Sequence, residues 1–175
     1  YRIKHSDLMS KGLGLLGDPN SESNPEEKKI VRAPKILIMG GGTMGYLLAL
    51  LLSKVYKIER EQIVVTGRDT SKLIKFQYLA TRHPIGTYMT NDGKYDYNKK
   101  IALDLENAGN PGSYDLVFEC VGWPFVEQNI ELALRVLKDG GIIAMEGLAE
   151  QDIEIDFKKL LEKRIFIKGF YRGSI

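Results

Sequence analysis

Three glycines at fixed spacing are the residues of this sequence whose types and positions most directly suggest chemistry. Gly40, Gly42 and Gly45 form a G-x-G-x-x-G pattern within KILIMGGGTMGYLLALLLSKV, after an apolar run and before a helical pattern. In that setting the first glycine permits a tight turn, the second lets a pyrophosphate approach the backbone, and the third lets helix and strand pack closely. The helix would then point its unpaired N–H groups at the phosphates. The pattern predicts a dinucleotide site.

The same stretch has two other interpretations. No charged side chain occurs from Ile36 to Leu52, which raises the possibility of a membrane span. Such a span needs about 20 apolar residues, however, and each of three adjacent glycines costs about 1 kcal/mol of helix propensity. A glycine turn that only reverses the chain is the structural alternative. We favour the dinucleotide site and expect no membrane-spanning segment.

The end of the second apolar run, VVTGRDT, indicates which nucleotide is preferred. NAD sites generally place an acidic residue about 20 positions after the glycines, where it binds the ribose 2′-OH. Gly67 stands at that place, and the guanidinium of Arg68, which follows, suits a 2′-phosphate. Thr66 and Lys72 could add contacts. Asp69 is the candidate for a displaced ribose acid, but its position before Thr-Ser-Lys is typical of a helix cap. We therefore predict NADP rather than NAD, the alternative being an exposed arginine with no ligand.

Apolar runs and helical patterns alternate along most of the chain. We expect strands at 35–39, 62–66, 86–90, 114–120, 141–147 and 164–170, and helices at 43–56, from 70, at 97–107, from 124 and at 157–163. This alternation is typical of a parallel sheet with helices on both faces, whose strands are almost continuously apolar. The predicted fold class is α/β, with a doubly wound, mostly parallel six-stranded sheet, or Rossmann fold.

The chain is predicted to consist of two parts. Residues 18–29, DPNSESNPEEKK, are polar and contain two prolines, which is typical of a linker or surface loop. We therefore expect an N-terminal segment and linker at 1–33 and a dinucleotide-binding domain at 34–175. The chain begins at Tyr1 rather than Met, which is consistent with an excised domain.

The helix expected after the glycines is apolar on more than one face, through Leu47, Leu48, Leu50, Leu51 and Leu52. A helix of this kind is usually buried on every side. One face would pack on the sheet. The others would face either a missing domain or second subunit, or simply the rest of this domain, and the sequence leaves both alternatives open.

Composition excludes several classes of function. With 43% hydrophobic and 27% charged residues, the composition is that of an ordinary globular protein. The net charge of only +2 gives no reason to expect a nucleic-acid partner. Cys120 is the only cysteine, which excludes an internal disulfide and favours a reducing, cytoplasmic location. With two histidines besides, we expect no metal site built from this chain alone.

Several segments in order carry a resemblance to a known family. KILIMGGGTMG, VVTGRDTSKL, YDLVFECVGWP and ALRVLKDGGIIAMEGL, with IDFKKLLEKRIFIKG, resemble the cofactor domain of medium-chain dehydrogenases/reductases, the zinc-type alcohol, polyol and sugar dehydrogenases. The match runs from about residue 34 to the C-terminus. The glycine loop and EREQIVVTGRDTSKL are also similar to pyrroline-carboxylate reductases, but their later half is not similar to LKDGGIIAMEGL.

The resemblance implies cofactor contacts at matching positions. These are Gly40, Gly42, Thr43, Met44 and Gly45 at the pyrophosphate; Gly67, Arg68 and Lys72 at the adenosine ribose and its phosphate; Cys120, Val121 and Gly122 at the adenine and ribose; and Gly147, Leu148 and 170–172 at the nicotinamide. The GRD turn and FECVG are most similar to NADP-preferring sugar and polyol members. The family also suggests a homodimer formed by pairing of sheet edges.

We assign no catalytic residue in this chain. In the family a separate domain supplies the catalytic zinc or proton relay and the substrate pocket, and this sequence has neither the ligands nor the length for it. His83 is expected in a solvated loop, and Cys120, Glu119 and Glu146 are expected to be structural. Trp123 could equally cap the core or stack on adenine.

The leading hypothesis is therefore the NADP(H)-binding domain of an oxidoreductase that transfers hydride between a nicotinamide and an alcohol or carbonyl substrate, with catalytic residues outside this chain. The alternatives are a stand-alone NADP(H)-binding or sensing module and a pyrroline-5-carboxylate reductase-like domain. A methyltransferase-like use of the sheet is disfavoured, because the glycine spacing suits pyrophosphate better than a methionine moiety.

Overall fold

The computed structural model describes residues 33–84, 112–147 and 152–170 of the chain. Two compact units are present, Tyr1–Pro34 and Lys35–Ile175, and all the elements described below belong to the second. Within the described residues, no helix has the length and apolar character needed to cross a membrane.

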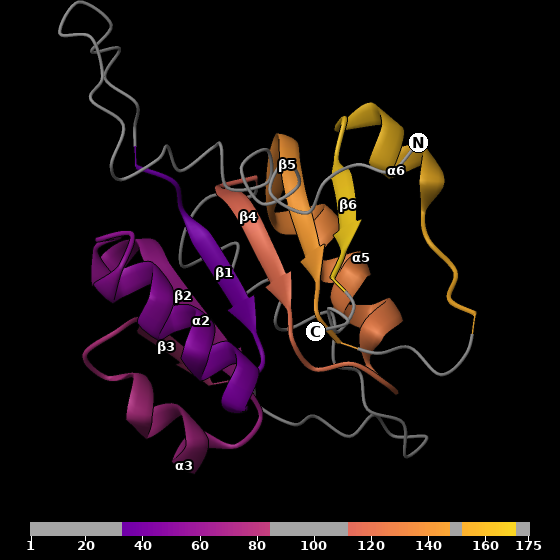
Figure 1. The fold of residues 1–175 in the computed structure, drawn as a ribbon. Coiled ribbons are helices and arrows are strands. Elements are labelled where there is room, and N and C mark those ends of the chain that lie inside the picture. Colours follow the sequence, from indigo (N-terminus) through magenta and orange to yellow (C-terminus); the bar gives the residue numbers. More distant parts are fainter. Residues whose placement is uncertain (1–32, 85–111, 148–151, 171–175) are drawn as a thin grey trace, which may run out of the picture. The chain divides into compact units, whose positions relative to one another are not determined.

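Six parallel strands form one sheet in the order β3-β2-β1-β4-β5-β6. Their bounds are β1 Ile36–Met39, β2 Ile63–Gly67, β3 Thr81–Pro84, β4 Tyr114–Glu119, β5 Leu137–Met145 and β6 Phe166–Gly169. The chain moves outward from β1 in one direction through β2 and β3, and then returns to the other side of β1 with β4 (Figure 1). This is the doubly wound order, and the predicted Rossmann-type fold is confirmed.

The helices connect these strands. They are α2 Thr43–Lys54, α3 Thr70–Leu73, α5 Val126–Val136 and α6 Phe157–Glu162, with short 3₁₀ turns at Arg60–Gln62 and Ile74–Phe76. The predicted helices at 43–56, from 70 and at 157–163 are confirmed, with small shifts at their ends. The predicted helix at 97–107 lies outside the described residues.

Helices cover both faces of the sheet, as the sequence predicts. Leu37 and Met39 of β1 share a hydrophobic cluster with Ile130 and Ala133 of α5. The intervening Ile38 lies against α2, since a Cβ added to Gly45 would come within 3.2 Å of its side chain. Successive side chains of a strand point to opposite faces, so α2 and α5 lie on opposite sides of β1. All three β1 residues are almost fully buried.

The third strand of the sheet lies before the range predicted for it. The structure forms β3 at Thr81–Pro84, whereas the predicted strand at 86–90 lies outside the described residues. His83 therefore belongs to a strand, and its assignment to a loop was wrong. Among the described strands β3 pairs only with β2, which makes it an edge strand. Such a strand tolerates proline and polar residues, so TRHP lacks the apolar pattern of the central strands.

The connection from α5 to β5 also differs from the prediction. The helix begins at Val126 after the cap residue Phe125, rather than at Pro124. β5 begins at Leu137, so the KDGG segment lies within the strand instead of forming a stop before it. Tyr114 pairs with Leu137 but Leu116 pairs with Ile142, so the extra residues of β5 bulge out. Gly140, with φ of +75°, supplies the left-handed conformation that this bulge contains.

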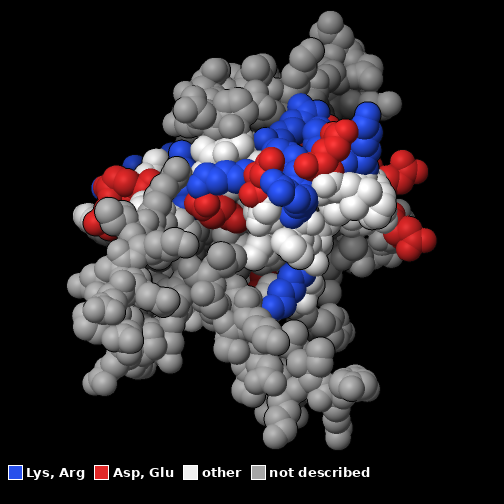
Figure 2. Space-filling view, turned by 90° about the horizontal axis from the view of Figure 1, so that it is seen from above, with Lys and Arg blue, Asp and Glu red and all other residues white. Residues whose placement is uncertain are grey.

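Charges are interspersed at the amino ends of the strands. Figure 2 shows this end of the sheet, where basic and acidic side chains lie side by side. Lys138 Nζ lies 2.5 Å from Asp115 Oδ1, and the backbone N–H of Lys35 donates to Asp115 Oδ2 at 2.7 Å. Arg164 forms a longer ion pair with Asp139, at 3.6 Å. Lys138 and Arg164 on this face are therefore each paired with a neighbouring carboxylate.

Candidate functional site

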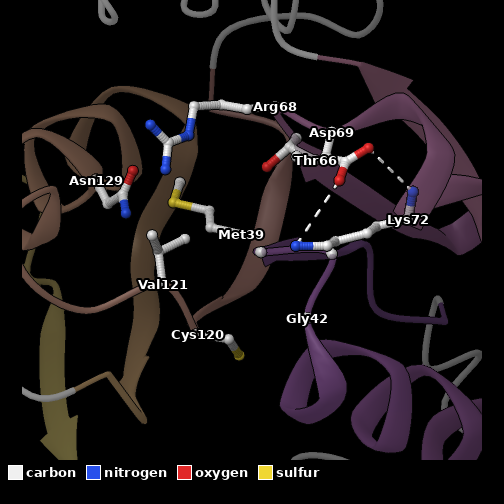
Figure 3. Close-up of a pocket in the computed structure, with 12 residues that line it drawn as sticks. Met39, Gly42, Thr66, Arg68, Asp69, Lys72, Cys120, Val121 and Asn129 are labelled. Atoms are coloured by element: carbon white, nitrogen blue, oxygen red, sulfur yellow. Dashed lines mark hydrogen bonds and ion pairs between the residues drawn. The ribbon is translucent and has the colours of Figure 1, made fainter.

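A cleft lies at the carboxyl ends of β1, β2 and β4. It is lined by Met39, Gly40, Gly41, Gly42, Thr66, Gly67, Arg68, Asp69, Lys72, Cys120, Val121 and Asn129 (Figure 3). Because β2 and β4 flank β1 and the chain leaves them in opposite directions, this is the topological switch point of the sheet. Open α/β sheets bind their ligands at that point, outside the carboxyl ends of the strands.

The glycine loop connects β1 to α2 on the floor of the cleft. Gly40 has φ of +119°, in the left-handed region that favours glycine, and its N–H donates to the Thr66 carbonyl at 2.9 Å. A Cβ on Gly45 would collide with the carbonyl oxygen of Gly40. Gly45 therefore has the close helix–strand packing that its position in the pattern predicts.

Gly42 has a different environment. A Cβ added there would meet nothing within 4 Å, although the residue lines the cleft. It is the N-cap of α2, and no side chain caps the helix. The first N–H groups of α2 are therefore not engaged by a capping side chain, which leaves them available to an anion. The space above Gly42 and these amides fit the pyrophosphate of a dinucleotide.

Two basic side chains and one acid follow β2. Asp69 caps α3, because its carboxylate accepts from the Ser71 N–H at 3.0 Å, the Ser71 hydroxyl at 2.5 Å and the Lys72 N–H at 3.4 Å. The Ser71 hydroxyl is the main reason that the pKa of Asp69 is lowered. Lys72 lies 3.7 Å from the same carboxylate. The cap predicted for Asp69 is confirmed.

Arg68 extends across the cleft. Its side chain runs from the end of β2 over Met39 toward Asn129 of α5 (Figure 3). The guanidinium carbon lies 4.2 Å from the centroid of the Phe125 ring. Within the described part of the chain, Arg68 has no hydrogen bond or ion pair that would neutralise it.

The opposite wall depends on a buried carboxylate. Glu119, which has no exposed surface, accepts from the N–H groups of Val121 at 3.0 Å and Gly122 at 3.1 Å and from Asn129 Nδ2 at 2.8 Å. It thereby connects the end of β4 to α5, and its predicted structural role is confirmed. Gly147 donates its N–H to the Glu119 carbonyl, and a side chain on Gly147 would collide with the Glu119 carboxylate.

The thiol of Cys120 lies in this wall. Burial raises its pKa well above the ordinary value, and the charges of Glu119 and Glu146 raise it further. A thiol of this kind is a poor nucleophile, in agreement with the structural role expected for Cys120. Burial also raises the pKa of Glu146. Trp123 is 42% exposed and therefore does not cap the core.

The cleft brings together many of the residues predicted to contact a cofactor, namely Gly40, Gly42, Gly67, Arg68, Lys72, Cys120 and Val121. Other predicted contacts lie beside the cleft without lining it, namely Thr43, Met44, Gly45, Gly122 and Gly147. Leu148, Tyr171 and Arg172 lie outside the described residues.

Sequence reasoning missed three lining residues. Met39 and Gly41 adjoin the motif and follow from its geometry. Asn129 lies 10 residues beyond its partner Glu119 and is only 3% exposed. The signal was present, because an acid at the end of an apolar strand needs a donor, and Asn129 is a polar residue beside the apolar face of α5.

A metal centre does not fit the residues seen here. Over 33–84, 112–147 and 152–170, no three histidine, cysteine, aspartate or glutamate side chains come together in a way that could hold a metal ion. We therefore assign no metal ligand in this part of the chain.

Strand order, cleft position and glycine loop together define a nucleotide-binding type of doubly wound domain. A family model described as zinc-binding dehydrogenase matches residues 48–175. The chain belongs to the zinc-binding dehydrogenase family, and the predicted resemblance is confirmed.

Relatives cover this chain well but are themselves longer. Ribulose-5-phosphate reductase 1 of Staphylococcus aureus is 29% identical over 85% of this chain and 37% of its own length. L-Threonine 3-dehydrogenase of Escherichia coli is 28% identical over 97% of this chain and 46% of its own length. The chain therefore spans less than half the length of these relatives.

Solved structures show the same fold. The crystal structure of S. aureus TarJ in complex with NADPH has a TM-score of 0.58 and 24% identity, covering 83% of this chain and 39% of TarJ. The structure of 2R,3R-butanediol dehydrogenase from Bacillus subtilis has a TM-score of 0.61 and 17% identity, covering 79% of this chain and 35% of that protein.

Proposed function

We propose that this chain is the NADP(H)-binding domain of an oxidoreductase that transfers hydride between a nicotinamide and an alcohol or carbonyl substrate. The observation that carries the proposal is the cleft at the switch point, with bare glycine backbone on one side and Arg68 and Lys72 on another. The family supports it, as do relatives named as reductases and dehydrogenases and the neighbour crystallised with NADPH.

Each part of the cleft has a group of the dinucleotide that it suits. Gly40, Gly42 and the start of α2 would hold the pyrophosphate, because N–H groups and open space coincide there. Arg68 and Lys72 would bind the 2′-phosphate by charge-assisted hydrogen bonds. When bound, the nicotinamide supplies or accepts the hydride, and the protein orients it.

We further propose that the substrate pocket and catalytic residues lie outside this chain. Relatives are more than twice as long as the region they share with it. Incubating the chain with NADPH and a ketose phosphate, or with NADP and a polyol, should give no change in absorbance at the nicotinamide band. Turnover by this chain alone would contradict the assignment.

Titration with NADPH, NADH and S-adenosylmethionine tests the function. Binding can be followed by calorimetry or by the rise in melting temperature that a ligand of the folded state causes. We expect NADPH to bind more tightly than NADH, and S-adenosylmethionine not to bind. Preference for S-adenosylmethionine would indicate a methyltransferase-like domain instead, and failure of all three to bind would refute the proposal.

The pair Gly67→Asp and Arg68→Ala should reverse the preference. The new carboxylate can accept from a ribose 2′-OH but repels a 2′-phosphate, and the guanidinium that would bind the phosphate is removed. Loss of one charge-assisted hydrogen bond corresponds to roughly a tenfold change or more. We expect NADPH affinity to fall at least tenfold while NADH affinity is kept or improved. An unchanged ratio of dissociation constants would refute the assignment of the 2′-phosphate.

A homodimer is the assembly we propose. β6 is the last strand of the sheet, and Phe166 within it is 65% exposed. Phe166→Lys should therefore give a monomer in light scattering, while Phe157→Lys, at an equally exposed position on α6, should leave the dimer intact. A monomeric unmodified chain would contradict this. The cytoplasmic location expected from the sequence stays a prediction.

A further inference from the structure

Arg68 is held by an aromatic ring from a distant part of the chain. The guanidinium carbon lies 4.2 Å above the ring of Phe125, which belongs to the β4–α5 crossover, whereas Arg68 follows β2. A guanidinium at this distance from an aromatic face is attracted by the ring quadrupole. The contact therefore spans the switch point and connects its two sides.

Phe125 is well placed to hold another side chain. Its N–H donates to the Gly122 carbonyl at 3.0 Å, and its own carbonyl accepts from the Asn129 N–H at 2.9 Å in the first turn of α5. Asn129 and Gly122 are in turn fixed by the buried Glu119 carboxylate. The ring thus projects from a backbone that is anchored on both sides.

The contact with the ring uses none of the hydrogen-bond donors of the arginine. A guanidinium has five N–H donors, and its attraction to an aromatic ring depends on its charge rather than on a hydrogen bond. The adjacent carboxylate, Asp69, is committed to the cap of α3. No other described residue pairs with Arg68. A cation with unused donors is therefore held over the cleft between Met39 and Asn129 (Figure 3).

We propose that Phe125 is a specificity-determining positioning residue: it holds Arg68 in the orientation that binds the 2′-phosphate. The inference rests on the proposed function. A free arginine loses much rotamer freedom when it binds a phosphate, and a stacked arginine has already lost part of it. Removal of the ring should therefore lower the affinity for NADPH but not the affinity for NADH, which has no 2′-phosphate for Arg68 to bind.

The test is a double-mutant cycle on the 175-residue chain. Dissociation constants for NADPH and NADH are measured for the unmodified chain, Phe125→Leu, Arg68→Ala and the double variant. Phe125→Met is a second truncation, Phe125→Tyr keeps the ring, and Trp123→Leu removes a neighbouring exposed aromatic side chain as a control. Melting temperatures without nucleotide check that each variant is folded.

We expect Phe125→Leu and Phe125→Met to raise the dissociation constant for NADPH about three- to tenfold, which corresponds to the usual strength of a contact between a cation and an aromatic ring. The dissociation constant for NADH should change less than about twofold. Phe125→Tyr and Trp123→Leu should keep the preference. In the Arg68→Ala background, loss of the ring should have no further effect on NADPH.

Several outcomes would overturn the inference. Equal weakening of both nucleotides would make Phe125 an adenine platform, and tighter NADPH binding would mean that the stack competes with the phosphate. An unchanged NADPH-to-NADH ratio would leave Phe125 without this role while the proposed function stands. Failure of the unmodified chain to bind either nucleotide would refute the proposed function itself.

Discussion

The glycines around the cleft are needed for different reasons. Gly45 is required by the fold, because any side chain there would strike the backbone of Gly40. Gly42 has open space around it and an extended backbone that any residue can adopt, with φ of −76° and ψ of −169°. A glycine that neither packing nor backbone conformation requires is best explained by a ligand that approaches it.

Cys120 permits a pH-dependent prediction at the same scale. Its raised pKa means that the thiolate, the reactive form, is scarce at pH 8. We expect the rate of alkylation by iodoacetamide to keep rising above pH 9.5 in the folded chain. In urea, where the pKa is about 8.5, the rate should level off near that pH. A plateau below pH 9 in the folded protein would contradict the raised pKa, whatever the accessibility of the thiol.

The connection from α5 to β5 lies at the end of the sheet opposite the cleft. The carboxyl end of α5 is held by Lys163, whose Nζ donates to the carbonyl oxygens of Leu134 at 2.8 Å, Arg135 at 3.2 Å and Leu137 at 2.6 Å. These carbonyls have no partner within the helix, and a cation at this end also complements the helix dipole. Lys163 is the cap residue at the end of α6, so it ties this helix end to the connection between α5 and β5.

Removal of that cation should destabilise the domain. Lys163→Met keeps the aliphatic length but loses the hydrogen bonds to three carbonyls, and we expect a loss of roughly 1–3 kcal/mol in the free energy of unfolding. Lys158→Met is the matched control, because the one contact of the Lys158 amine with the described residues is an exposed ion pair with Glu162, at 3.8 Å. Its effect should be below about 1 kcal/mol. Equal losses in the free energy of unfolding for Lys163→Met and Lys158→Met, measured by urea denaturation, would contradict the capping role of Lys163.

The strands and helices differ in how well the sequence predicts them. The central strands were predictable because burial on both faces requires continuous apolar runs. The edge strand β3 was not, since an edge places little demand on its side chains. The leucines of α2 left two alternatives for the faces of the helix that point away from the sheet. Leu52 is buried, but Leu47 and Leu51 are 52% and 41% exposed. This helix is not buried on every side by the described residues.

At the scale of the whole molecule, the site follows from topology more than from any single motif. The sequence predicted the glycines and Arg68 because each follows directly on an apolar run. It could not predict the contact between Arg68 and Phe125, because these residues follow β2 and β4, which become neighbours only when both strands pair with β1. Local sequence patterns do not predict contacts that arise from the order of strands in the sheet.

The most direct test of the central claim is calorimetric titration of NADPH into the unmodified chain and into Gly42→Ala. A methyl group at Gly42 meets no protein atom within 4 Å, so the melting temperature without nucleotide should change little. If a pyrophosphate occupies the space above it, NADPH affinity should fall at least tenfold, since a side chain there blocks approach to the backbone. A Gly42→Ala chain that is stable and binds NADPH as tightly as the unmodified chain would contradict the account.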